Sequence, residues 1–126
     1  IAESGLPAIV GPMLTDRSKI ELKNQNLKTP GILSKLGIKV AIMTDHPVIE
    51  QKHSLVQVAL FVKAGLPELE ALKAVTINAA KLCGIDNRVG SIKEGKDADV
   101  VIWSGHPLDI MTEASVVILN GEIVKN

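Results

Sequence analysis

The stretch KVAIMTDHP, residues 39–47, places two residues that could do chemistry directly after an apolar run. The carboxylate of Asp45 can bind a hard cation or take up a proton, and the imidazole of His46 can bind a metal or exchange a proton near neutral pH. The ends of strands also carry Asp as a turn former. The residues alone therefore leave two interpretations open: a polar loop, or the edge of an active site.

The histidines allow only a limited metal site. The chain has three, His46, His53 and His106, and no His-x-His pair. Asp45, His46 and His53 could supply three zinc ligands and leave one position open. Neighbouring residues on an extended chain point in opposite directions, however, so Asp45 and His46 could share a metal only on a bent loop. His106, in WSGHPLD, is interpreted as a turn residue.

A second candidate motif is excluded. Residues 90–96, GSIKEGK, match the spacing of a phosphate-binding loop, but Asp97 follows where that loop needs Ser or Thr. The loop must also lead into a helix whose amino end holds the anion, whereas an apolar strand pattern follows here. The segment is interpreted as a hairpin turn.

The elements that would position Asp45 follow an α/β order. Apolar runs at 8–14 and 38–44 predict buried strands, and little alternation within them suits strands that are covered on both faces. Helical patterns at 30–36, 54–65 and 66–84 follow the two strands. The order strand, helix, strand, helix, helix is typical of parallel α/β construction.

The pattern changes after about Asn87. Short β-branched runs at 98–103 and 116–119 predict strands, and Asn120-Gly121 before EIVK predicts a two-residue hairpin. Residues 87–126 are therefore expected to form a separate small layer of antiparallel β structure.

Composition excludes several classes of function. Lys and Arg total 14, as do Asp and Glu, so a net charge of zero gives no attraction to nucleic acid or to anionic membranes. The apolar runs are shorter than the ~20 residues of a membrane span. Cys83 is expected to be a small core residue, and a single cysteine suits a reducing compartment, so we expect a cytoplasmic protein. A chain that begins at Ile1 in mid-element is expected to be a piece of a longer protein.

Three segments in order carry a family resemblance: GIKVAIMTDHP, EALKAVTINAAKLCGIDNRVGSIKEGKDADVVIWSG and VVILNGEIVKN. They resemble the C-terminal end of the amidohydrolase superfamily, most closely its imidazolonepropionase-like metal-dependent hydrolases. The resemblance implies that residues 1–86 are the last two β/α units, with strands seven and eight, of a (β/α)8 TIM-type barrel. Residues 87–126 would be the C-terminal strands of a small β-sandwich.

The resemblance also implies chemistry. The family hydrolyses C–N bonds of small molecules with water activated by a divalent metal, usually zinc. Asp45 resembles the strand-eight aspartate that binds the metal and acts as the general base. From their positions, directly after Asp45 and before a helix start, His46 and His53 are candidates for substrate contact; the alternative is that they are exposed loop histidines without that role. The remaining ligands are absent, so the chain alone is expected to be inactive.

Two alternatives stay open: a non-catalytic fragment that associates with itself, and a small-ligand-binding α/β domain. Unpaired strand edges favour association, so we expect a homo-oligomer.

Overall fold

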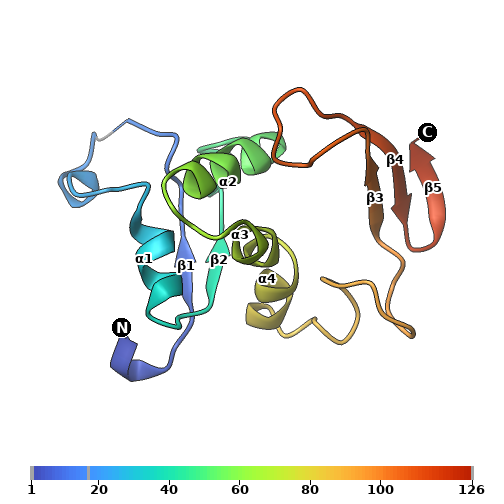
Figure 1. The fold of residues 1–126 in the computed structure, drawn as a ribbon, viewed down its shortest axis with the longest axis horizontal. Coiled ribbons are helices and arrows are strands. Elements are labelled where there is room, and N and C mark those ends of the chain that lie inside the picture. Colours follow the sequence, from blue (N-terminus) through green and yellow to red (C-terminus); the bar gives the residue numbers. More distant parts are fainter. Residues whose placement is uncertain (1, 17, 126) are drawn as a thin grey trace.

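The computed structural model describes residues 2–16 and 18–125 and contains two separate sheets (Figure 1). A parallel pair, β1 (Ala8–Val10) and β2 (Val40–Ile42), lies among the helices. An antiparallel sheet in the order β3-β4-β5 lies at the other side of the molecule. Its strands are β3 (Val100–Trp103), β4 (Ala114–Leu119) and β5 (Glu122–Lys125).

Four α-helices and three short 3-10 helices connect these strands in the part of the chain that the structure describes. The α-helices are α1 (Thr29–Lys35), α2 (Ser54–Lys63), α3 (Glu68–Ala74) and α4 (Ile77–Leu82). The 3-10 helices are η1 (Ala2–Ser4), η2 (Ile20–Leu22) and η3 (Gln51–His53). The predicted order of strand, helix, strand and further helices is confirmed, and so is the parallel pairing of the first two strands.

Both strands of the parallel pair are shorter than their apolar runs predict. β1 ends at Val10, because Gly11 has a φ of 137° and Pro12 has no backbone N–H to continue the ladder. β2 ends at Ile42. The apolar residues beyond each strand lie in loops at its carboxyl end.

The single helix predicted over 66–84 is wrong. The structure has two helices there, α3 and α4, separated at Val75 and Thr76. Thr76 adopts φ −129° and ψ −100°, which is not helical, and its Oγ1 donates a hydrogen bond of 2.7 Å to the Leu72 carbonyl. A threonine hydroxyl that competes for backbone partners explains why the helical pattern does not continue.

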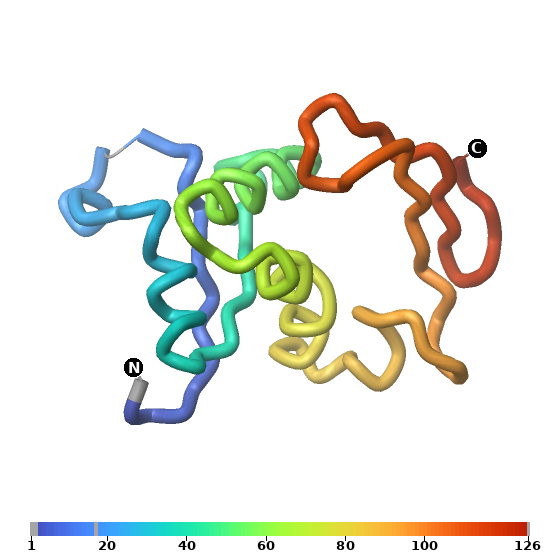
Figure 2. Tube along the Cα trace, viewed as in Figure 1, coloured from blue at the N-terminus to red at the C-terminus, as the bar shows by residue number. Residues whose placement is uncertain are grey.

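The core is aliphatic, as the composition predicts, and it is built around the only phenylalanine. Phe61 and Val58 of α2 and Ala71 of α3 are 0% exposed, and Leu66 between those helices is 2% exposed. Leu108, from the segment between β3 and β4, packs against this cluster. Figure 2 shows that segment reaching back from the antiparallel sheet toward α2.

The predicted hairpin between β4 and β5 is confirmed. Asn120 and Gly121 have φ values of 50° and 83°, the positive pair that a type I′ turn requires. The hairpin predicted at residues 90–97 is wrong, because no described strand precedes it. It is instead an irregular turn in which the Lys96 ammonium donates hydrogen bonds to the Asp86 and Val89 carbonyls and to Ser91 Oγ.

Cys83 was expected in the core, and this prediction is also wrong. The residue follows α4 and is exposed. It lines an open groove between α4 and β3 together with Ile85, Val100 and Val101. The apolar periodicity of the helix therefore marks a face that fronts this groove instead of the packed core.

Among the described residues, no helix combines the length and apolar character that crossing a bilayer requires.

Candidate functional site

Asp45 lies in the loop that follows β2, at the carboxyl end of the parallel pair. Its φ of 54° is left-handed, a conformation that Asp tolerates better than most side chains do. The Val48 N–H donates to the Asp45 carbonyl at 2.8 Å, and the Ile49 N–H donates to the Thr44 carbonyl at 3.3 Å. These two bonds fold residues 45–49 into a compact turn.

Thr44, the residue before Asp45, holds the start of this turn in place. Its side chain is 3% exposed, and Oγ1 donates a hydrogen bond of 2.9 Å to Gln51 Oε1 in η3. Ile49, 7% exposed, is buried at the other end of the turn. The backbone that carries Asp45 is therefore fixed on both sides although Asp45 itself is exposed.

The Asp45 carboxylate is not engaged by the rest of the described chain. No hydrogen bond or ion pair holds it within residues 2–16 and 18–125, although neighbouring Glu50 forms an ion pair with Lys52. An exposed carboxylate on a fixed backbone can bind a cation or accept a proton without first breaking an internal contact.

His46 and His53 are both exposed and lie on the same loop. His53 is the last residue of η3, directly before α2. Within the described residues, no group of three or more His, Cys, Asp or Glu side chains is arranged to hold a metal. The structure therefore does not bring Asp45, His46 and His53 together as a three-ligand site.

His106 has a structural role, in agreement with its interpretation as a turn residue. It lies between β3 and β4, where its Nδ1 accepts a hydrogen bond from the Leu108 N–H at 3.3 Å. Its Nε2 lies 3.0 Å from Glu68 Oε1 at the start of α3.

Gln57 was missed by the sequence analysis. It lies in α2, is 0% exposed, and its side-chain amide contacts the backbone beyond both parallel strands. Oε1 accepts from the Met13 N–H at 2.8 Å, and Nε2 donates to the Met43 carbonyl at 2.9 Å. The sequence signal was one polar residue on the buried face of an otherwise apolar helix, in LVQVALF.

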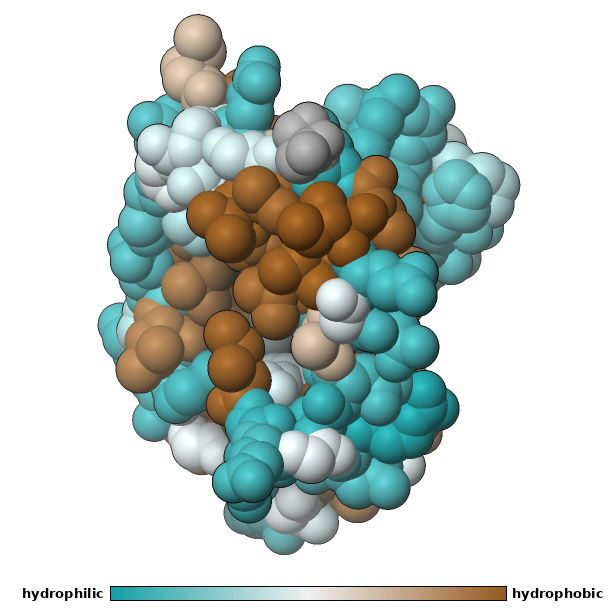
Figure 3. Space-filling model, turned by 90° about the vertical axis from the view of Figure 1, so that its right-hand side faces the viewer, coloured by the Kyte–Doolittle hydropathy of each residue, from teal (hydrophilic) through white to brown (hydrophobic). Residues whose placement is uncertain are grey.

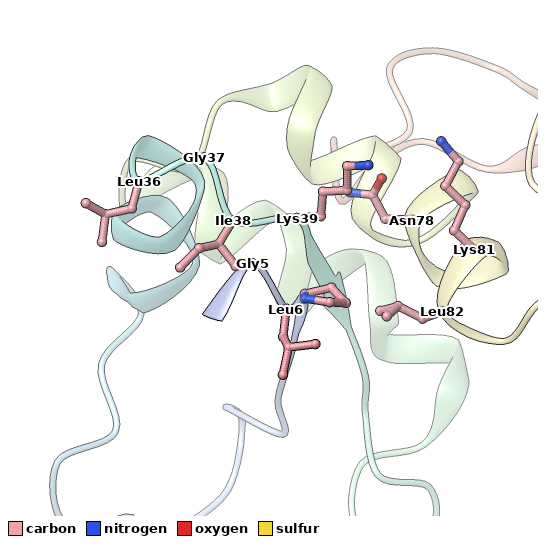
Figure 4. A pocket seen from close by; sticks show the side chains of 10 residues that line it. Gly5, Leu6, Leu36, Gly37, Ile38, Lys39, Asn78, Lys81 and Leu82 are labelled. Carbon is pink, nitrogen blue, oxygen red and sulfur yellow. The ribbon is translucent and has the colours of Figure 1, made fainter. Parts of the chain in front are cut away.

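A cavity of about 330 Å³ lies at the opposite end of the parallel pair (Figure 4). It is lined by residues that precede β1 and β2, such as Leu6 and Ile38, and by Asn78 and Leu82 of α4. Barrel-type folds keep their chemistry at the carboxyl ends of the strands. We therefore place the candidate site at Asp45 and not in this cavity.

Comparison with known proteins identifies the family. Residues 14–125 match the model of the amidohydrolase family. The crystal structure of an amidohydrolase from Thermotoga maritima MSB8 is similar with a TM-score of 0.93 and 45% identity, over 98% of this chain and 32% of that chain. This neighbour indicates an α/β fold of the TIM-barrel type.

Curated relatives agree with this match. An imidazolonepropionase from Shewanella frigidimarina (strain NCIMB 400) is 47% identical over 66 residues, which cover 44% of this chain and 15% of the relative. A 5-methylthioadenosine/S-adenosylhomocysteine deaminase from Thermoanaerobacter pseudethanolicus (strain ATCC 33223 / 39E) is 38% identical over 103 residues, 74% of this chain and 24% of the relative. The chain spans less than a third of the length of each of these two relatives. The resemblance found in the sequence is confirmed, and the chain belongs to the amidohydrolase family.

Proposed function

We propose that this chain is the C-terminal part of a metal-dependent amidohydrolase that hydrolyses a C–N bond of a small molecule. One observation carries the proposal: within the matched residues 14–125, a free carboxylate, that of Asp45, stands on a fixed turn at the carboxyl end of a parallel strand. A TIM-type barrel holds its catalytic groups at that position.

In the architecture that we propose, β1 and β2 are strands seven and eight of the parent barrel. Residues 1–86 then form its last two β/α units, and residues 87–126 form the C-terminal strands of a small β-sandwich. The Thermotoga structure supports this assignment because this chain covers only 32% of it, as a part of a larger barrel would.

Asp45 is proposed to do two things. It contributes one oxygen ligand to a divalent metal, for which zinc is our choice, and it takes a proton from the attacking water and passes it to the leaving nitrogen. The metal, when bound, would act as a Lewis acid that polarises the carbonyl and makes that water more acidic. A carboxylate suits both tasks of Asp45 because it is a hard oxygen donor and a base.

The donor set of the chain fits Asp45 as one ligand of such a metal. The Asp45 carboxylate is uncommitted, but the described residues contain no group of three metal-binding side chains. The other ligands must therefore come from parts of the parent outside this chain, and we propose that the chain alone is inactive. His46 and His53, both exposed on the loop of Asp45, are proposed to contact the substrate.

The substrate class follows from chemistry that the relatives share by name. One is an imidazolonepropionase and another is a deaminase of methylthioadenosine and S-adenosylhomocysteine. We propose a small molecule with a cyclic amide or an amine on an unsaturated carbon, acted on in the cytoplasm.

The test is an Asp45→Asn variant of the complete parent polypeptide, loaded with zinc and assayed on a panel of cyclic amides and aminated heterocycles. Asn tolerates the left-handed backbone at position 45 and keeps one oxygen donor, so the variant should fold. It cannot accept the proton, and we expect kcat to fall at least ~100-fold, the lower range of general-base contributions.

The matched control is Glu50→Gln. It removes a carboxylate from the same loop, and the ion pair that it breaks with Lys52 is exposed and therefore of little value. The control should keep the activity of the parent. If the Asp45→Asn variant turned over substrate as fast as the Glu50→Gln variant, the proposed role of Asp45 would be refuted.

A further inference from the structure

We propose that Gln57 is a positioning residue. Its side chain replaces a backbone hydrogen bond that is missing between the two strands, and it thereby fixes the backbone from which the Asp45 turn starts. The inference rests on the proposed function of Asp45.

The ladder between β1 and β2 follows a regular alternation. The Ala8 N–H donates to the Lys39 carbonyl at 2.9 Å, and the Met43 N–H donates to the Val10 carbonyl at 3.0 Å. In a parallel ladder, alternate residues of each strand bond to the same neighbour. Two residues further along, the donor to the Met43 carbonyl would be the nitrogen of residue 12.

Residue 12 is proline, which has no N–H, so the Met43 carbonyl loses its donor. Gln57 Nε2 supplies that donor at 2.9 Å. In the same alternation the Pro12 carbonyl would accept from the Asp45 N–H, and Gln25 Nε2 occupies it instead at 2.9 Å. Two side-chain amides thus satisfy the carbonyls at which the backbone ladder ends.

The strands approach closely at this point. A Cβ on Gly11 would lie 1.9 Å from the Met43 oxygen and 3.4 Å from Gln57 Nε2. The Met43 carbonyl is therefore held between the backbone of Gly11 and the amide of Gln57. Since Gln57 is 0% exposed, solvent does not reach its amide to take over either bond.

The consequence concerns Asp45, two residues after Met43. Its backbone N–H is free of the ladder, and this freedom accommodates the left-handed φ of 54°. The last fixed point before the turn is the Met43 carbonyl, held from α2, while Oε1 of the same amide holds Met13 beyond the other strand. Gln57 thereby sets the distance between Asp45 and any group carried by the segment after β1.

An amide is required because the two contacts have opposite polarity. The Met13 N–H needs an acceptor and the Met43 carbonyl needs a donor, and Gln supplies both from one planar group. Methionine has a similar shape but supplies neither bond. Glutamate, when ionised, would accept from Met13 and repel the Met43 carbonyl.

The experiment compares Gln57→Met with Val58→Ala in the complete parent polypeptide with zinc bound. Val58 is the next residue of α2 and is also 0% exposed, so its truncation weakens packing without touching the strand ends. The readouts are kcat and KM below the melting range of both variants, and the hydrogen-exchange rate of the Met13 amide.

For Gln57→Met we expect Met13 exchange to be at least ~10-fold faster and kcat to fall ~10- to 100-fold, the usual loss when a group that orients a metal ligand is removed. KM should change by less than ~3-fold, because the substrate contacts remain. Val58→Ala should keep the parent's kcat and its slow Met13 exchange.

The outcomes separate this inference from the proposed function. Unchanged Met13 exchange in Gln57→Met overturns the hydrogen-bond assignment, whatever the activity. Faster exchange with a kcat equal to that of Val58→Ala overturns the positioning role. Full activity in Asp45→Asn refutes the base assigned to Asp45 and with it the positioning of that base, while fast Met13 exchange in Gln57→Met still supports the hydrogen-bond assignment.

Discussion

At the level of single residues, the candidate site depends on backbone positions that few side chains tolerate. Asp45 is left-handed at the carboxyl end of β2, and Gly11 has a φ of 137° beyond the end of β1. The two lie on neighbouring segments at the carboxyl end of the parallel pair. Substitutions at either position therefore test the local geometry and not the surface chemistry alone.

We predict that Gly11→Ala destabilises the protein by about 2–6 kcal/mol. The change adds about 1–3 kcal/mol of backbone strain, and the new Cβ would lie 1.9 Å from the Met43 oxygen, an overpacking cost of similar size. Chemical denaturation of both proteins measures the difference in the free energy of unfolding.

Gly5→Ala is the matched control for this prediction. Gly5 also has a positive φ, 66°, but a Cβ there meets no atom within 4 Å, so only the strain of about 1–2 kcal/mol applies. Equal losses of stability in the two variants would show that the close approach of Gly11 to Met43 contributes nothing.

At the level of elements, the parallel pair has two open edges, and one of them is partly covered by a helix. Residues 39, 41 and 43 of the β2 segment bond toward β1, so the Val40 carbonyl points to the opposite edge. Asn78 of α4 donates to this carbonyl from Nδ2 at 2.9 Å. A side chain of α4 thus takes the place of a neighbouring strand at that position.

We predict that Asn78→Ala lowers the free energy of unfolding by about 1–3 kcal/mol. Val40 is 4% exposed, so its carbonyl would lose its partner where solvent has little access. Lys81→Ala, an exposed position on the same helix, should change stability by less than about 0.5 kcal/mol. Urea and thermal denaturation measure the free energy of unfolding of each variant. An equal loss in Asn78→Ala and Lys81→Ala would contradict the contribution of this edge contact.

At the level of the whole molecule, the antiparallel sheet presents an apolar face. The register places Val100, Ile102, Val116, Ile118 and Ile123 on one side of β3–β5. Ile102 is 51% exposed and Ile123 is 63% exposed. Figure 3 shows apolar surface gathered on the side of the molecule that carries this sheet.

We predict that the isolated chain associates with itself through this face, and that Ile123→Lys weakens the association. Lysine at this exposed apolar position puts a charge where a second chain would exclude water. Light scattering coupled to size-exclusion chromatography over a concentration series measures the change. We expect at least a tenfold rise in the dissociation constant.

Glu122→Lys controls for the added charge, because its partner Leu119 lies on the other side of the sheet. It should leave the association close to that of the unchanged chain. A monomer at all concentrations, or an equal effect of both variants, would contradict the assignment of this face and the expected homo-oligomer.

Local sequence determined much of this protein. Apolar runs and turn residues predicted β1, β2 and the β4–β5 hairpin, because Asn-Gly and strand propensity act over a few neighbouring residues. The motif series from Gly37 onward indicated the family and marked Asp45 as the candidate catalytic residue.

Tertiary contacts decided the rest. The exposure of Cys83 and the bonds of Gln57 depend on groups distant in sequence or on what packs against a face. Helical periodicity gives the direction of an apolar face but not its partner, so Cys83 was misplaced. A proline that removes one donor from a ladder is visible in the sequence. Only the folded chain shows that an amide 45 residues later replaces it.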